Sequence, residues 1–313
     1  MKQKETIVKK YDKKVLALQV LLIGVFSLVL LQCAGAEDEQ PLKNAIIWRI
    51  TGNELQKPSY LYGTIHSIDS SDFFLHKTVA EQLRRSDILV LETDLTIPDY
   101  QQRAFQYALM EDDSLDRLLS ADQFARVKDF FLKEFSFPIE AVKRMKPFYL
   151  ASLLSALKPS EKKVSYEEVF IAIAREEEKA IGGISTLEKE AEMLSLVDMD
   201  EQVEYLLREI AAYKNGNADA IREKMVRAYT EADLEEINAL MVNSLEDFQS
   251  IYARMFTERN RQWVPRMEDM MLDQSCFFAV GVGHLPGEDG LIRLLRNQGY
   301  KVVPVHMDFW FHD

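Results

Sequence analysis

Two stretches of this sequence follow the same pattern: SYLYGTIH at residues 59–66 and CFFAVGVGH at residues 276–284. Each is an apolar run, rich in aromatic or β-branched residues, that ends in a glycine followed three residues later by a histidine. Such runs are typical of buried strands. We therefore expect two strands of one sheet, each followed by a Gly-x-x-His turn at its carboxyl end.

The flanking segments extend this pattern into two similar halves. A strand over 45–51 precedes the first stretch, and a helix over 77–85 and a strand over 87–95 follow it. A helix opened by Gly287-Glu288-Asp289 and a strand over 300–305 follow the second stretch. Because strand–helix–strand crossovers return the chain in the same direction, the pattern predicts an α/β fold. Its mixed sheet would be formed from two distant strand–Gly-x-x-His–helix–strand halves.

The residues between the two halves predict a large helical insertion, at about 98–275. Apolar residues recur at helical spacing, as Phe124, Val127, Phe131 and Phe135 illustrate. Residues 145–157 and 166–178 are two further candidate helices, and AIGGIS at 180–185 is a candidate short strand. We expect residues 37–313 to form a single domain that includes this insertion.

The composition excludes several classes of protein. The chain has 313 residues, of which 47% are hydrophobic and 28% charged, with only 12 Gly and 9 Pro. These values exclude a disordered, collagen-like or disulfide-scaffold protein. The net charge of −13, without a basic patch, argues against nucleic acid as a partner, because phosphate binding needs clustered Lys and Arg.

The first 36 residues have the features of an export signal. A lysine-rich start precedes the uncharged run over 15–31, and small residues follow at 34–36. Cys33 stands where the acylated cysteine of a bacterial lipoprotein would lie. We therefore expect an exported protein, either cleaved after Ala36 or lipidated on Cys33, with an uncleaved membrane anchor as a further alternative. The predicted location is the cell envelope, the periplasm or the exterior, with membrane contact through the signal or the lipid.

Two of the five histidines, His66 and His284, occupy matching places just past a buried strand. Ligands of open α/β sheets bind at the carboxyl ends of the strands, so both imidazoles would lie at such a site. Glu92 ends the apolar run ILVL at the same edge, with Asp94 a weaker candidate two residues on. Two imidazoles and a carboxylate are a common ligand set for a divalent metal such as manganese, cobalt or zinc. The alternative is ordinary loop histidines and a glutamate that caps the loop or pairs with an arginine.

Arg259 replaces an apolar residue on the inward face of a predicted helix. The apolar residues at helical spacing with it are Phe248, Ile251 or Tyr252, Met255 and Trp263. An inward arginine needs an anionic partner, either a carboxylate of the protein or a substrate.

These residues also carry a resemblance to a known family, TraB/GumN, over about 45–306. The matching segments are YGTIH at 62–66, LVLETD at 89–94, MKP at 145–147, ERN with Trp263 at 258–263, and GVGHLPG at 281–287. The family includes the membrane-tethered Tiki metalloproteases and bacterial pheromone-shutdown proteins. The resemblance implies a metal site of His66, Glu92 and His284, with Arg259 and Asn260 as a polar pair on one helix.

The sequence departs from the family at Ser185, which stands where the family has a glutamate in a Gly-Leu-Glu-Thr motif. This raises the alternative of an altered or inactive protein, unless Glu188 or Glu167 compensates. From the sequence we expect Ser185→Glu to raise any activity.

Three hypotheses for the function follow from these observations. The first is an exported metal-dependent hydrolase, peptidase-like, in which water activated at the metal attacks a peptide carbonyl. Glu92, Arg259 and Asn260 would be its catalytic residues, and its partner would be a peptide or protein substrate. The second is a non-catalytic envelope protein that sequesters a peptide or pheromone in the same cleft. The third is a structural envelope protein.

Overall fold

The computed structural model describes residues 45–157 and 162–307. The predicted export signal, including Cys33, lies outside these residues. Within the described ranges, none of the helices combines the length and the apolar character needed to cross a membrane.

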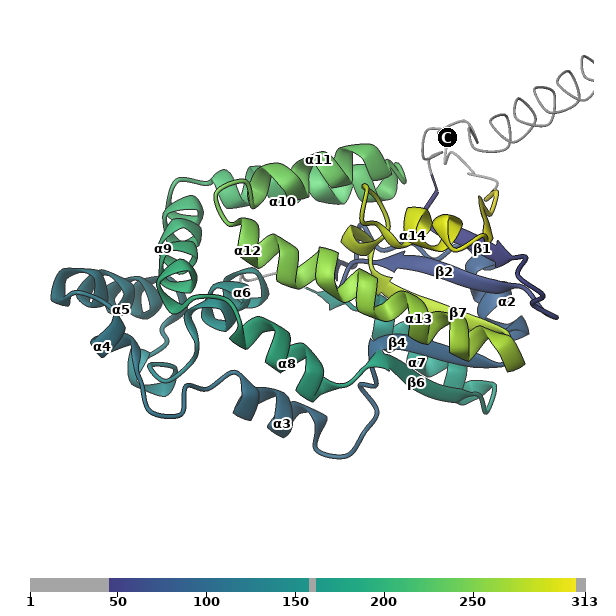
Figure 1. The fold of residues 1–313 in the computed structure, drawn as a ribbon. Coiled ribbons are helices and arrows are strands. Elements are labelled where there is room, and N and C mark those ends of the chain that lie inside the picture. Colours follow the sequence, from purple (N-terminus) through teal and green to yellow (C-terminus); the bar gives the residue numbers. More distant parts are fainter. Residues whose placement is uncertain (1–44, 158–161, 308–313) are drawn as a thin grey trace, which may run out of the picture. The chain divides into compact units, whose positions relative to one another are not determined.

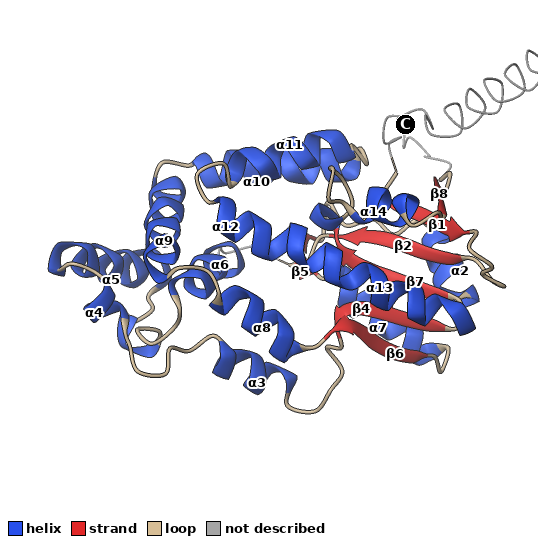
Figure 2. Cartoon of the chain, in the orientation of Figure 1, coloured by secondary structure: helices blue, strands red, loops and turns tan. Residues whose placement is uncertain are grey.

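The centre of the molecule is a six-stranded mixed sheet (Figures 1 and 2), in the order β6-β4-β7-β2-β1-β8. β6, β4, β7 and β2 run parallel to one another, and β1 is antiparallel to both β2 and β8. The strands of this sheet are β1 (Ile47–Thr51), β2 (Ser59–Thr64), β4 (Ile88–Thr93), β6 (Ala180–Ser185), β7 (Cys276–Gly281) and β8 (Lys301–Pro304). A separate two-stranded sheet pairs β3 (Ile68–Asp69) with β5 (Lys163–Val164). The predicted mixed α/β fold is confirmed.

The two halves interleave in this sheet. β7, from the end of the chain, lies between β2 and β4, both from its beginning. The central strands are apolar along their length because helices cover both faces. Residues 89–91 of β4 and 276–280 of β7 are at most 1% exposed. The two Gly-x-x-His strands belong to one sheet, as predicted, and they are neighbours in it, since β2 and β7 pair directly.

Helices form the rest of the molecule. They are α2 (Lys77–Arg85), α3 (Tyr100–Tyr107), α4 (Leu115–Leu118), α5 (Ala121–Phe135), α6 (Pro147–Leu157), α7 (Tyr166–Glu176), α8 (Leu187–Ser195), α9 (Met199–Lys214), α10 (Asn217–Thr230), α11 (Leu234–Ser244), α12 (Gln249–Tyr252), α13 (Glu258–Asp273) and α14 (Leu291–Asn297). Short turns of other helical types are η1 (Ile139–Ala141), η2 (Ala253–Thr257, a π-helical turn) and η3 (Val282–His284). Figure 1 shows α13 and α14 in front of the sheet and α2 and α7 behind it.

The segment between the halves divides between two places. β6 pairs with β4 at the edge of the sheet, and α7 packs against β4 and β6. The helices α4, α5, α6 and α9 surround a second hydrophobic core, which includes Phe130, Phe131 and Leu206. The insertion is therefore mostly helical, and it also returns one strand to the sheet.

The last helix begins later than the sequence pattern predicts. Gly287 has a left-handed backbone with a φ of 87°, and the Gly290 N–H donates to the Gly287 carbonyl oxygen at 3.2 Å. Residues 287–290 thus form a turn, and α14 starts at Leu291. The expectation that Gly287-Glu288-Asp289 opens the helix was wrong because a glycine at positive φ favours a turn.

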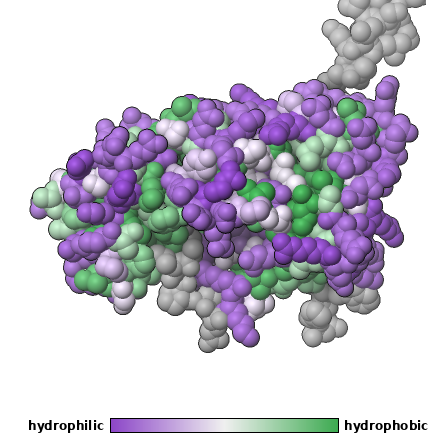
Figure 3. All heavy atoms as spheres, turned by 90° about the horizontal axis from the view of Figure 1, so that it is seen from below, coloured by the Kyte–Doolittle hydropathy of each residue, from purple (hydrophilic) through white to green (hydrophobic). Residues whose placement is uncertain are grey.

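Hydrophilic residues cover most of the face drawn in Figure 3, and hydrophobic residues show in separate areas between them. Large exposed hydrophobic side chains come from different elements, such as Phe105 of α3, Leu132 of α5 and Leu272 of α13. Scattered apolar side chains of this kind are normal on a protein surface and do not mark an interface.

Candidate metal centre

The carboxyl ends of three adjacent parallel strands bring the predicted residues together. Thr64 of β2 lies opposite Gly281 of β7, and Leu91 of β4 lies opposite Ala279 of β7. His66, Glu92 and His284 therefore leave the sheet at the same edge. This is the edge at which open α/β sheets bind ligands.

Gly281 lies at the centre of this group. A Cβ atom at this position would lie 3.2 Å from Glu92 Oε1, 3.5 Å from His66 Nε2 and 3.7 Å from His284 Cδ2. The three predicted side chains thus converge on the space that the glycine leaves open. The Gly281 backbone has a φ of −52°, outside the left-handed region that favours glycine, so space rather than backbone conformation requires the glycine.

The two carboxylate oxygens of Glu92 have different partners. Oε1 accepts a hydrogen bond from the Gly281 N–H at 2.7 Å, and Oε2 accepts one from Arg259 Nη2 at 2.5 Å. Burial raises the pKa of the Glu92 carboxyl. The charges of Arg259 and the nearby histidines lower this pKa by a larger amount, so the net shift is downward. Glu92 is therefore ionised and retains oxygen lone pairs on the side that faces the histidines.

His284 is buried, and its tautomer follows from its neighbour Asn260. The Asn260 amide nitrogen donates to the carbonyl oxygens of His284 and Asp289, at 3.1 and 2.7 Å. The Asn260 oxygen must then be the atom that lies 2.6 Å from His284 Nδ1, so Nδ1 carries the proton. Burial lowers the pKa of His284 to about 3, which leaves the ring neutral.

The other ring nitrogen of His284, Nε2, is therefore unprotonated, and it lies 3.7 Å from Glu92 Oε1. Two lone-pair atoms face each other there with no proton between them. The Trp263 and Phe256 rings pack near the imidazole, with ring centroids 4.4 and 5.1 Å away. A cation is the partner that such a pair of atoms would accept.

His66 is held by a second carboxylate, Glu167 of α7. His66 Nδ1 lies 2.7 Å from Glu167 Oε1, which also accepts from the Thr64 hydroxyl at 2.6 Å. Partial desolvation of the ring acts to lower the pKa of His66, but the hydrogen bond and charge of Glu167 outweigh it and raise the pKa. Because the side chain is 68% exposed, water screens both effects. The contact directs Nε2 toward the space beside Gly281.

Arg259 lies between two carboxylates. Its Nη2 contacts Glu92 Oε2, and its Nε lies 2.5 Å from Glu190 Oε2 of α8, at an angle that makes this an ion pair rather than a hydrogen bond. The guanidinium also stacks on Trp263, with its Cζ 4.6 Å from the ring centre. Burial raises the pKa of Glu190, and the charge of Arg259 acts against this shift.

A π-helical turn positions this arginine. The helix α12, which carries Ile251, continues through η2 into α13, which begins at Glu258. The Arg259 Nη1 donates to the Met255 carbonyl oxygen of η2 at 3.2 Å. π-helical turns of this kind occur frequently at functional sites.

The other carboxylates considered from the sequence have different places. Asp94 accepts hydrogen bonds from the N–H and hydroxyl of Thr96, which form a local turn. Glu188 pairs with Arg103. Glu167 is the one that reaches a predicted ligand, as the partner of His66. Glu190, which sequence reasoning did not single out, reaches the site because β6 and α8 pack beside it.

The nitrogen and oxygen donors beside Gly281 are of the kind that binds a divalent cation, although they do not yet surround one point. Among the residues of 45–157 and 162–307, no three His, Cys, Asp or Glu side chains already surround one point as metal ligands. The Gly281 cradle and the facing lone pairs of His284 and Glu92 nevertheless fit a cation, and each histidine has its Nδ1 held by a neighbour. Partners that hold the second ring nitrogen are usual for histidines that bind metals.

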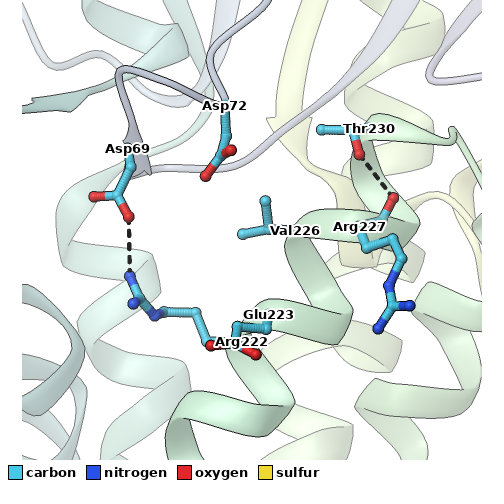
Figure 4. Close-up of a pocket in the computed structure, with 7 residues that line it drawn as sticks. All are labelled: Asp69, Asp72, Arg222, Glu223, Val226, Arg227 and Thr230. Atoms are coloured by element: carbon cyan, nitrogen blue, oxygen red, sulfur yellow. Dashed lines mark hydrogen bonds and ion pairs between the residues drawn. The ribbon is translucent and has the colours of Figure 1, made fainter.

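A separate pocket of about 420 Å³ lies between β3 and α10, where Figure 4 shows its lining residues. Asp69 and Asp72 lie on one side, and Arg222 pairs with Asp69 at 3.4 Å. Its lining contains none of the residues that surround Gly281. Its charged groups include both signs, so they do not select one class of ligand.

Comparisons with known proteins agree with the motifs. The model of the TraB/PrgY/gumN family matches residues 46–304. Metalloprotease TIKI1 of Danio rerio is 21% identical over 312 residues, which cover 83% of this chain and 63% of the relative. Metalloprotease TIKI2 of Danio rerio is 21% identical (83% and 60% covered), and metalloprotease TIKI1 of Homo sapiens is 22% identical (84% and 62% covered). The chain thus spans about three fifths of the length of these relatives. No solved structure matches it.

Proposed function

The chain belongs to the TraB/PrgY/gumN family, and from this premise we propose that it is a metal-dependent hydrolase that cleaves peptide bonds. The observation that carries the proposal is the convergence of His66, Glu92 and His284 on the open space at Gly281. The metalloprotease names of its distant relatives support a peptidase-like role.

In this proposal the cation is held by Nε2 of His66, Nε2 of His284 and Oε1 of Glu92. Nitrogen and carboxylate oxygen donors suit manganese, cobalt or zinc. A bound divalent ion would lower the pKa of water and polarise the peptide carbonyl.

The protein's own groups would then share the remaining work. Glu92 is held ionised by Arg259 and the Gly281 N–H, so it can serve as a ligand or accept a proton. The terminal nitrogens of Arg259 each carry two hydrogens, which leaves N–H groups to stabilise a developing oxyanion. Asn260 is 2% exposed, and its side-chain amide is fully engaged in hydrogen bonds to His284 and Asp289. We therefore assign it a positioning role.

The proposal includes export. The lysine-rich start and the apolar run at 15–31 lie outside the described residues, and they support cleavage after Ala36 or lipidation of Cys33. The substrate would accordingly be a peptide or protein met in the cell envelope or outside it.

A second candidate, sequestration of a peptide without cleavage, is favoured by one observation. The hydrogen bond and charge of Glu167 raise the pKa of His66, so a proton competes with a cation for that imidazole. A site in this state would bind a peptide through Arg259 and still lack the cation needed for turnover.

Metal analysis joined to a peptide-cleavage assay tests the proposal. We would measure manganese, cobalt and zinc bound to the purified protein and to His66→Ala and His284→Ala. His306→Ala, which removes an exposed histidine, is the control. New peptide termini would be detected by mass spectrometry of a peptide library.

We expect one ion per chain in the wild type and the control, loss in both site variants, and cleavage that follows occupancy. Cleavage that persists in both site variants would refute the mechanism. Metal-independent peptide binding without cleavage would favour sequestration.

A further inference from the structure

Arg259 is shared between carboxylates from two elements that are distant in sequence. Glu92 is the last residue but one of β4, and Glu190 lies in the first turn of α8. The three side chains are between 13% and 16% exposed, so water screens their charges only weakly. They form one charge network beside the Gly281 space.

The charges of this network decide how strongly Glu92 can attract a cation. The carboxylates of Glu92 and Glu190 both contact the single guanidinium of Arg259, so the network pairs two negative charges with one positive charge. Without Glu190, the guanidinium would balance Glu92 alone, and the site would have no net negative charge to offer. With Glu190 present, one negative charge remains in excess.

The surroundings of Glu190 keep it in this place. The Ser185 hydroxyl and the Trp263 indole N–H hydrogen-bond to its carboxylate. Ser185 ends β6 and lies opposite Thr93, the residue directly after Glu92. The edge strand, the helix α8 and Trp263 of α13 thus all hold Glu190 against Arg259.

We propose that Glu190 is a positioning residue that holds Arg259 at the site and offsets its charge, so that Glu92 keeps the negative charge needed to bind a divalent cation. This inference rests on the proposed function. It assigns to Glu190 no contact with the cation or with the substrate.

The test is the affinity of the full chain for Mn²⁺ alone, measured by isothermal titration calorimetry. The absorption spectrum with Co²⁺ serves as a second readout of the ligand set. Glu190→Gln removes the charge and keeps the shape. Glu192→Gln makes the same change on an exposed position of the same helix and is the matched control.

We expect Glu190→Gln to bind Mn²⁺ about tenfold more weakly, because one charge close to a divalent ion is removed in a partly buried site. Glu192→Gln should bind like the wild type. The double variant Ser185→Glu/Glu190→Gln returns the charge from the neighbouring strand, and it should recover affinity to within about threefold of the wild type. Glu190→Asp, which keeps the charge, tests the same point if Glu190→Gln does not fold.

The outcomes separate this inference from the proposed function. Unchanged affinity in Glu190→Gln, or a loss that neither charged variant recovers, overturns the role of Glu190 alone. A wild type that binds no cation, or binds it equally well without His66 and His284, overturns both proposals.

Discussion

Among single residues, Gly281 is the position at which a substitution should affect cation binding without unfolding the protein. Its backbone conformation suits any residue, while an added methyl group would occupy the space shared by His66, Glu92 and His284. We predict that Gly281→Ala lowers divalent-cation affinity at least tenfold and changes the free energy of unfolding by less than about 2 kcal/mol. Calorimetric titration and urea unfolding measure the two effects.

Gly182→Ala is the matched control for this substitution. Gly182 lies in β6 of the same sheet, and its added methyl would make only ordinary contact, 3.7 Å from Ile88 Cδ1. If Gly281→Ala binds cations as tightly as Gly182→Ala does, the space beside Gly281 is not the binding site.

Asn260 supports a second prediction at this scale, through the tautomer of His284. Asn260→Ala removes the acceptor of the Nδ1–H and leaves the Asp289 carbonyl without its donor. Cation affinity should fall about 10- to 100-fold, as when other partners of metal-binding histidines are lost. Stability should fall by about 1–3 kcal/mol. The exposed Asn243→Ala is the control, and equal affinity in the two variants would exclude the positioning role.

The site residues differ in how far the sequence predicts them. His66, Glu92 and His284 follow apolar runs, and strand ends can be recognised from one sequence. Arg259 stands out because it interrupts an apolar helical stripe. Glu190 gives no such signal, since it is one of several acids at the start of α8, and only the packing of α8 and β6 brings it to Arg259. Glu167 likewise contacts His66 only because α7 covers the sheet.

At the scale of elements, contacts at the amino-terminal ends of β2, β4 and β7 hold these three strands in register. Asp87, directly before β4, accepts hydrogen bonds from the Ser275 N–H before β7 and from Lys57 before β2, both at 2.8 Å. The Lys57 hydrogen bond and the Ser275 N–H lower the pKa of Asp87. One carboxylate thus joins the starts of the three strands whose other ends carry His66, Glu92 and His284.

We predict that Asp87→Asn lowers the free energy of unfolding at pH 7 by about 1 kcal/mol, a modest value because the side chain is 38% exposed. Since the folded-state pKa is depressed, the stabilisation is present above the ordinary Asp pKa of about 3.9. It is lost as the pH falls through the lower folded value. Urea unfolding between pH 7 and 2 measures it.

The exposed Asp112→Asn serves as the control for this comparison. A difference between wild type and Asp87→Asn that stays constant down to pH 2 would contradict the assignment.

The strands of the sheet can be predicted from the sequence, whereas the position of β6 and the π-helical turn η2 cannot. Apolar runs and crossovers predict the strands and their mixed sheet, because burial on both faces leaves a clear pattern. The place of β6 at the sheet edge depends on pairing with β4, which no local pattern encodes. The π-helical turn η2 is also hidden, since Phe248 to Trp263 read as one regular stripe. The structure also changes the expectation for Ser185→Glu, because a glutamate added alone would face Glu190.

At the scale of the whole molecule, the sheet and the helical segment have separate hydrophobic cores. The candidate centre belongs to the sheet, at the ends of strands from both the beginning and the end of the chain. The intervening segment contributes Glu167, Glu190 and Arg259 from three different helices. Binding of a cation would therefore tie together parts of the chain that are distant in sequence, and it should raise the unfolding temperature.

A further prediction at this scale concerns the start of the chain. We expect residues 1–32 or 1–36 to be absent from the protein isolated from its natural host, because the basic start and apolar run have the features of an export signal. Intact-mass measurement checks this, and a chain that still begins at Met1 would favour an anchor. Fatty-acid labelling that disappears in Cys33→Ser would identify lipidation.

The central claim, that His66, Glu92 and His284 hold one divalent cation, is tested most directly by anomalous diffraction from crystals grown with zinc. The account predicts a single strong peak beside Gly281, about 2.0–2.2 Å from Nε2 of both histidines and from a Glu92 oxygen. A peak elsewhere, or crystals of the zinc-treated protein with no peak beside Gly281, would contradict it.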